Sequence, residues 1–131
     1  MRDLKASTNN LITIQDNLSN TKIGIYHNTI KSSDRIQYQS ELLKVLQDAS
    51  ESEKIKTAME YRLNYTLDKI TGFTDGSFGF DEKEISSDPE SKIFYPDWKT
   101  FLKENASDIL ESVNNLLFGQ PNFVLKKNSL S

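Results

Sequence analysis

A chain of 131 residues is expected to form one domain, and its net charge of −3 leaves no basic excess for a dedicated nucleic-acid binder. The absence of cysteine excludes disulfides and thiolate metal sites. The hydrophobic share of 36% is low for a compact globule, so we expect a modest core or an elongated shape completed against another chain.

No apolar run approaches the roughly 18 residues that a membrane span requires, so we expect no membrane partner. The first ten residues, MRDLKASTNN, lack the apolar segment of a secretory signal peptide. We therefore expect the protein in the cytoplasm or within a larger particle. Lysine far outnumbers arginine, and asparagine, isoleucine and serine are plentiful, which is typical of an AT-rich genome such as that of a low-GC bacterium or its phage.

The first segment with a pattern covers residues 8–30, and its spacing favours a helix. Leu11, Ile14, Leu18 and Ile25 recur at intervals of three and four, as in a narrow coiled-coil seam. Two observations favour strands instead. LITI and KIGIY read as short strands, and Gly24 weakens a helix by about 1 kcal/mol relative to alanine. We take the helix as the first expectation and the strands as the alternative.

A second helix is predicted over residues 33–48. Ser32 and Ser33 precede Asp34 as candidate N-caps. The apolar residues cover one broad half of the helix, which is typical of a helix with two neighbours: Ile36, Tyr38, Leu42, Leu43, Val45 and Leu46.

A third helix, over residues 51–71, is expected to organise the fold. Ser50 and Glu53 form the pattern of a capping box, and Gly72 follows the last apolar residue as a left-handed cap. Tyr61 and Tyr65 border the apolar face. The link to the preceding helix is short, which predicts an antiparallel helical hairpin. The apolar face consists of Ile55, Met59, Leu63, Leu67 and Ile70.

Residues 72–96 are predicted to be an irregular excursion. Asp75 and Gly76 indicate a turn, and the run 77–80 is expected to supply one strand of a small β-hairpin. Aromatic residues crowd this stretch and the start of the next helix, where they either cover one end of the core or anchor a partner. They are Phe73, Phe78, Phe80, Phe94, Tyr95 and Trp98.

The last predicted helix covers residues 97–118, beginning after Pro96 and ending before Gly119 and Pro121. Asn105 and Ala106 mark a candidate break, but the apolar stripe keeps its phase there. The tail adds one short apolar segment before about eight frayed residues, 124–131, and residues 1–8 are expected to fray as well.

The fold class expected from these elements is mostly α: an antiparallel bundle of three to four helices in a single domain, 1–131, with a long aromatic and acidic loop before the last helix. The expected core is Ile36, Leu43, Leu46, Ile55, Met59, Leu63, Leu67, Trp98, Leu102, Ile109, Val113 and Leu116.

Residues suited to catalysis are scarce. His27 is the single histidine and has no neighbour at a triad spacing, and no nucleophile elbow, phosphate-binding loop or zinc-protease motif occurs. The oxygens from Asp75 to Asp81 resemble a calcium loop only weakly, because Phe80 and Ser86 replace its glycine and its glutamate. We therefore expect no enzyme activity, no cofactor, no metal and no small-molecule substrate.

The sequence favours a non-enzymatic protein-interaction module that binds a protein partner or itself. The first hypothesis is a structural or assembly subunit of a larger complex, such as a phage particle. The second is a soluble adaptor or inhibitor of one protein target, acting through the loop 73–98, and the third is a small enzyme of unknown type. The predicted partner-binding residues are Phe78, Phe80, Tyr95, Asp81, Glu82 and Glu84.

Overall fold

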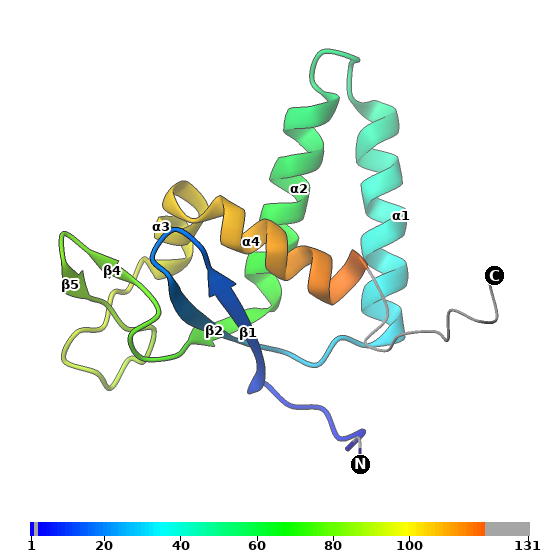
Figure 1. The fold of residues 1–131 in the computed structure, drawn as a ribbon. Helices are drawn as coiled ribbons and strands as arrows, with labels where there is room; N and C mark the ends of the chain where they lie inside the picture. Colours follow the sequence, from blue (N-terminus) through cyan, green and yellow to red (C-terminus); the bar gives the residue numbers. More distant parts are fainter. Residues whose placement is uncertain (2, 120–131) are drawn as a thin grey trace, which may run out of the picture.

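The fold mixes helices with antiparallel sheet, so the prediction of a mostly helical bundle is wrong. The computed structural model describes residue 1 and residues 3–119, with 46% helix and 20% strand over four helices and two small antiparallel sheets. The helices gather on one side of the larger sheet, and the smaller sheet lies at the opposite end from the helical hairpin (Figure 1). The expected apolar segment of the tail lies outside the described residues.

Residues 8–30 form a β-hairpin, not the expected helix, and the strand alternative was the correct one. β1 (Asn10–Asp16) pairs antiparallel with β2 (Thr21–His27), with Ile12 opposite Ile25 and Ile14 opposite Ile23. These four isoleucines recur at a period of two and point to the same face, toward the helices. A turn over residues 17–20 joins the strands, with Asn20 in the left-handed region at φ 57°.

The predicted helical hairpin is present. α1 (Ser32–Asp48) and α2 (Lys54–Lys69) run antiparallel and project away from the sheet (Figure 1). The expected caps are wrong in detail. Asp34 reaches back to accept a hydrogen bond from the Lys31 backbone N–H at 2.8 Å, and no side chain caps the start of α2.

Helix α2 continues directly into β3 (Ile70–Phe73), so the predicted left-handed cap at Gly72 is wrong. β3 pairs antiparallel with β2, which gives a three-stranded sheet in the order β1-β2-β3 with β1 at one edge. Gly72 is instead required for packing, because a Cβ there would lie 2.9 Å from the Ser87 hydroxyl.

The small hairpin expected in the excursion is present, as β4 (Gly79–Phe80) and β5 (Lys83–Glu84). The last predicted helix is divided into α3 (Trp98–Asn105), α4 (Ser107–Asn114) and a π-helical turn, η1 (Asn115–Gly119). The break falls at Ala106, whose φ of −136° is not helical. The prediction of one continuous helix is therefore wrong at the position where the sequence suggested a break.

The core lies where α2, α3, α4 and η1 meet the sheet, and half of the expected core is outside it. Leu63, Leu67, Trp98, Leu102, Ile109 and Val113 are buried as predicted. Leu46 is only partly buried. Five more expected core residues are exposed: Ile36, Leu43, Ile55, Met59 and Leu116. The isoleucines of β2 fill the core in place of these exposed residues, because the sheet, and not a fourth long helix, covers the core.

Candidate interaction surfaces

The six residues predicted to bind a partner lie around the β4–β5 hairpin. Its turn, Asp81-Glu82, has positive φ at both positions, 54° and 64°, as a type I′ turn requires. This turn holds both carboxylates in solvent, and Glu84 is exposed beside them in β5. The structure thus brings the three acidic side chains together at the tip of one protruding element.

The three predicted aromatic residues are not equivalent. Phe78 is half-buried and packs edge-on against Phe73, with ring centroids 5.0 Å apart. Phe80 is 59% exposed and meets Phe101 edge-on at 5.4 Å, and Tyr95 lies 5.1 Å from the same Phe101 ring. Phe78 therefore serves the core, whereas Phe80 stands open beside the acidic turn. Binding of a partner here stays a prediction.

A second surface, which the sequence analysis assigned to the core, is the flank of the α1–α2 hairpin. Ile36 and Leu43 on α1 are 67% and 60% exposed, and Ile55 on α2 is 87% exposed. Ile36 and Leu43 are seven residues apart and so share one helix face. Leu43 and Ile55 belong to the distal half of the hairpin, which stands clear of the sheet (Figure 1), whereas Ile36 lies nearer its base.

The base of the hairpin is fixed by aromatic packing. Tyr38, the one fully buried residue of α1, stacks on Phe118 of η1 with centroids 4.5 Å apart, and Tyr65 meets both rings edge-on. The Tyr38 hydroxyl donates to the Asn114 side-chain oxygen at 3.2 Å, and the Asn114 amide donates to Thr66 at 3.1 Å. This buried chain of hydrogen bonds connects α1, α4 and α2.

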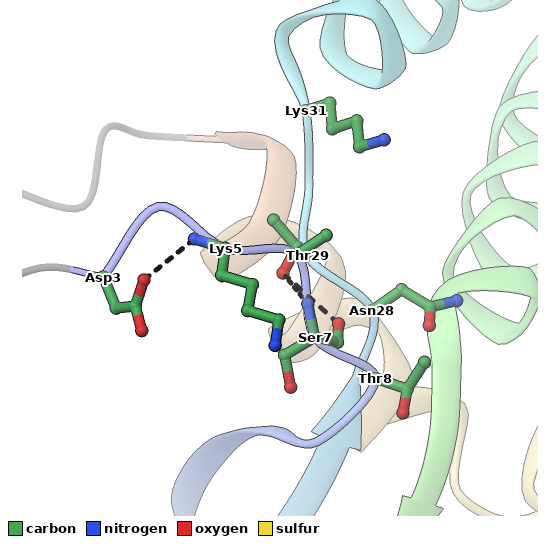
Figure 2. Close-up of a pocket in the computed structure, with 8 residues that line it drawn as sticks. Asp3, Lys5, Ser7, Thr8, Asn28, Thr29 and Lys31 are labelled. Atoms are coloured by element: carbon green, nitrogen blue, oxygen red, sulfur yellow. Dashed lines mark hydrogen bonds between the residues drawn. The ribbon is translucent and has the colours of Figure 1, made fainter.

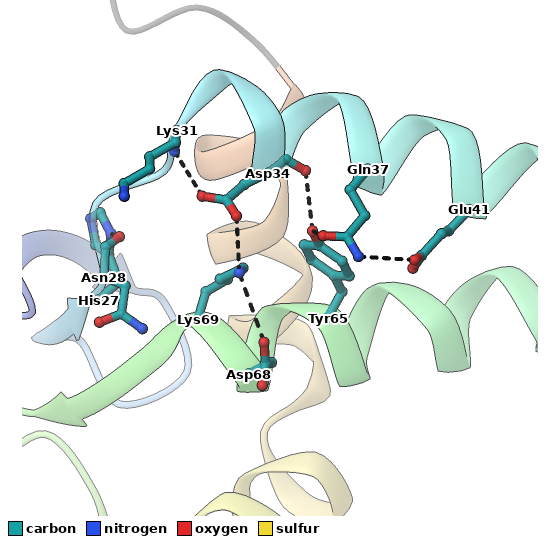
Figure 3. Close-up of polar contacts among 9 residues, drawn as sticks. All are labelled: His27, Asn28, Lys31, Asp34, Gln37, Glu41, Tyr65, Asp68 and Lys69. Atoms are coloured by element: carbon teal, nitrogen blue, oxygen red, sulfur yellow. Dashed lines mark hydrogen bonds and ion pairs between the residues drawn. The ribbon is translucent and has the colours of Figure 1, made fainter. Parts of the chain in front are cut away.

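A polar network closes the same base on the solvent side (Figure 3). The Lys69 ammonium lies 3.3 Å from an Asp34 carboxylate oxygen, and both side chains are mostly buried. The Lys31 backbone N–H, followed by Lys69, lowers the pKa of Asp34 below its usual value of 3.8. Burial and the nearby Glu41 carboxylate raise the pKa of Tyr61, whose hydroxyl donates to Glu41 and to the Tyr38 carbonyl. These contacts keep α1 and α2 in a fixed register.

His27 lies next to this network, in the strand that leads to α1. Its Nδ1 atom is 2.7 Å from the Asn28 carbonyl oxygen, and its side chain is half-buried. The nearest polar contact of the ring is thus a backbone group. Within residues 3–119, no group of three or more His, Asp or Glu residues is arranged to hold a metal ion.

Two hollows flank the N-terminal segment. The first, about 730 Å³, is polar and lies between residues 3–8 and the chain after β2 (Figure 2). Ser7 and Thr29 exchange hydrogen bonds across it, because the Ser7 N–H donates to the Thr29 hydroxyl and the Thr29 N–H donates to the Ser7 carbonyl. The N-terminal segment is therefore attached to the end of the β1–β2 hairpin.

The second hollow, about 770 Å³, is a groove between the outer edge of β1 and the start of α1, with η1 on its far side. The sequence analysis missed it, because the residues after β2 carry no motif and β1 was read as a helix. Alternation of Ile12 and Ile14 with polar residues was the signal that would have indicated a half-buried strand.

Comparison with known proteins gives no relative: no protein-family model, no curated protein and no solved structure matches the chain. Within the described part of the chain, no helix has the length and apolar character needed to cross a membrane.

Proposed function

We propose that this protein is a non-enzymatic interaction module, an assembly subunit that associates with a second copy of itself through the flank of the α1–α2 hairpin. The observation that carries the proposal is the exposure of Ile36, Leu43 and Ile55, between 60% and 87%, on an arm that leaves the body of the domain. Large apolar side chains that project into solvent from one protruding element are typical of a protein-binding site.

The dimensions of the arm suit a modest interface. A helix of 17 residues is about 25 Å long, and two adjacent helices are about 20 Å wide, so one face of the hairpin offers about 500 Å². This is below the roughly 800 Å² per partner of a standard interface, which favours association that is concentration-dependent and is completed by further subunits. Assembly subunits, for example those of a phage particle, add such contacts together.

Sedimentation velocity over a range of protein concentrations tests the proposal. The intact chain is expected to self-associate, and Leu43→Glu is expected to weaken association about tenfold or more, since it places a charge in an apolar contact. The matched control is Asn64→Glu, which adds the same charge at an exposed position of α2 on the side opposite Ile55. A chain that stays monomeric at every concentration and unfolds cooperatively would refute the proposal, as would association that Leu43→Glu leaves unchanged.

A second candidate function, an adaptor or inhibitor of one protein target, is favoured by the exposed Phe80 beside the acidic turn. Its partner would carry a basic patch next to an apolar pocket. Phe80→Ala is expected to abolish binding at unchanged melting temperature, whereas Phe78→Ala is expected to lower the melting temperature because Phe78 packs on Phe73. If neither variant loses binding, this candidate function is wrong.

A further inference from the structure

Among residues 3–119, no strand pairs with the outer edge of β1 in the larger sheet. The backbone of β2 shows which β1 residues face outward: the Gly24 carbonyl accepts from the Thr74 N–H at 2.9 Å, so Gly24 faces β3. Its neighbours Ile23 and Ile25 consequently face β1, where they oppose Ile14 and Ile12.

The intervening residues of β1 turn their N–H and C=O groups away from β2. These are Leu11, Thr13 and Gln15, and none of them is hydrogen-bonded to another described segment outside the hairpin.

This edge lacks the usual protection. Natural edge strands carry proline, lysine or a bulge that discourages pairing with another chain. The strand NLITIQD has no proline and no basic residue, and its pairing with β2 is regular over all seven residues. Backbone groups that are free, in a regular strand without such residues, form a template for an added strand.

The groove beside the edge has the shape and lining of a binding site for an extended chain. Its apolar lining residues come from the N-terminal segment, β1, the chain after β2 and η1: Leu4, Leu11, Ile12, Ile30, Leu116 and Leu117. Ligand-binding hollows of this kind fall in the range of about 300 to 1,000 Å³, and the groove holds about 770 Å³. The apolar lining suits side chains that point inward at every second position of a strand.

The charges around the groove select the occupant. Lys5, Lys31 and Arg35 line it, against the single acidic residue Asp3, in a chain whose net charge is −3. The Arg35 guanidinium donates to the Leu117 carbonyl, which uses one of its five N–H groups and holds the side chain in the groove. A local basic lining in an acidic protein favours an acidic ligand.

We propose that this groove binds an extended acidic peptide segment of a partner protein, which adds to the sheet as a fourth strand along β1. The backbone of the segment pairs with Leu11, Thr13 and Gln15. Every second side chain of the segment enters the groove, and these inward side chains alternate between apolar groups, which meet the apolar lining, and carboxylates, which meet Lys5, Lys31 and Arg35. The proposal is independent of self-association through the helical arm, since the two surfaces share no residue.

Fluorescence polarisation with the full chain and a short labelled peptide tests the proposal. The peptide repeats Glu-Ser-Val-Ser, so that the side chains on one face of the strand alternate between glutamate and valine. It is expected to bind, and the same peptide with lysine in place of glutamate is expected to bind at least tenfold more weakly. Two further peptides carry N-methyl groups on the glutamate and valine amides or on the serine amides. Because alternate residues of a strand bond to opposite sides, only one of the two should lose binding. Equal binding of the acidic and basic peptides, or equal binding of both methylated peptides and the parent, would overturn the proposal.

Variants of the protein locate the site. Lys31→Glu is expected to weaken binding of the acidic peptide about fivefold or more, whereas Lys44→Glu, on the exposed side of α1 away from the groove, leaves it unchanged. Thr13→Pro removes an outward N–H and preserves the β1–β2 ladder, so it is expected to fold and to lose binding. Equal effects of the two lysine variants would overturn the proposal even if Thr13→Pro did not fold.

Hydrogen exchange of the full chain shows whether the edge is open. The amides of Leu11, Thr13 and Gln15 are expected to exchange quickly and to slow when the acidic peptide is added. If they already exchange slowly without peptide, the edge is occupied and the proposal is wrong. Dependence of that protection on protein concentration would identify a second copy as the occupant, and protection independent of concentration would identify another segment of the same chain.

Discussion

Two leucines that look alike in the sequence should respond very differently to the same substitution. Leu110 in α4 is 0% exposed, and Leu43 in α1 is 60% exposed. Leu110→Ala removes buried carbon atoms and leaves a cavity in the core, which costs about 3 to 4 kcal/mol of unfolding free energy. Leu43→Ala removes atoms that water already contacts, and alanine is the better helix former, so its cost is about 0.5 kcal/mol.

Urea unfolding followed by far-ultraviolet circular dichroism measures both values. The slope of the unfolding free energy against urea concentration should be the same in each variant as in the parent. The shift of the transition midpoint then measures the change in stability alone. The protein concentration is varied, because association through the arm would add to the cost of Leu43→Ala only at high concentration. A cost above about 2 kcal/mol for Leu43→Ala at low concentration would show that Leu43 is buried within the monomer, and would refute the assignment of α1's outer face.

Three further predictions follow from the site geometry. Asn114→Ala leaves the hydroxyls of Tyr38 and Thr66 without their partner and is expected to cost about 2 to 3 kcal/mol in the same assay, against less than about 0.5 kcal/mol for Asn64→Ala at the surface. The carboxyl group of Asp34 has a folded-state pKa below 3.8, so its contribution to the unfolding free energy is complete above that pH and is lost as the pH falls through the folded pKa. Measurements of unfolding free energy at decreasing pH should show this loss in the parent. An identical pH profile in Asp34→Asn would contradict the prediction. Glu82→Gly relieves a positive φ of 64° in the β4–β5 turn and should raise the unfolding free energy by about 0.5 to 1 kcal/mol, whereas Lys83→Gly in β5 should lower it.

The sequence predicted the elements that have a local signature. Helices α1 and α2, their antiparallel pairing and the small β4–β5 hairpin follow from the local spacing of apolar residues, the short link between the helices and the turn residues, although the expected caps were wrong. The face of each helix that enters the core does not follow from them. Ile55 and Met59 belong to the apolar stripe of α2, yet the buried residues of this helix begin only at Leu63. Whether a residue of the stripe is buried depends on which other element packs against it, and the spacing of apolar residues gives no information about that element.

The error in residues 8–30 has a different cause. Leu11, Ile14, Leu18 and Ile25 fit a helical spacing, while Ile12, Ile14, Ile23 and Ile25 fit a strand spacing, and both patterns are present in the same letters. Leu18 is 93% exposed in the turn, so the helical interpretation relied on a residue that lies outside the core. The turn residues Asn17, Ser19 and Asn20 were the local signal that separated the two alternatives.

A candidate site could be predicted from the sequence only where its residues are close together in the chain. The aromatic and acidic residues around Phe80 stand together in sequence and in space. The groove beside β1 combines residues 3–13, 27–35 and 116–117, which only the tertiary fold brings together. Its recognition required the strand order and the direction of the Gly24 carbonyl.

The junction at Lys69 and Ile70 has a mechanical consequence. The last residue of α2 is followed at once by the first residue of β3, with no connecting loop between them. A tilt of α2 would therefore displace β3 directly, because no loop separates them. Through the β2–β3 and β1–β2 hydrogen bonds, the same tilt would also be felt at β1, at the other edge of the sheet.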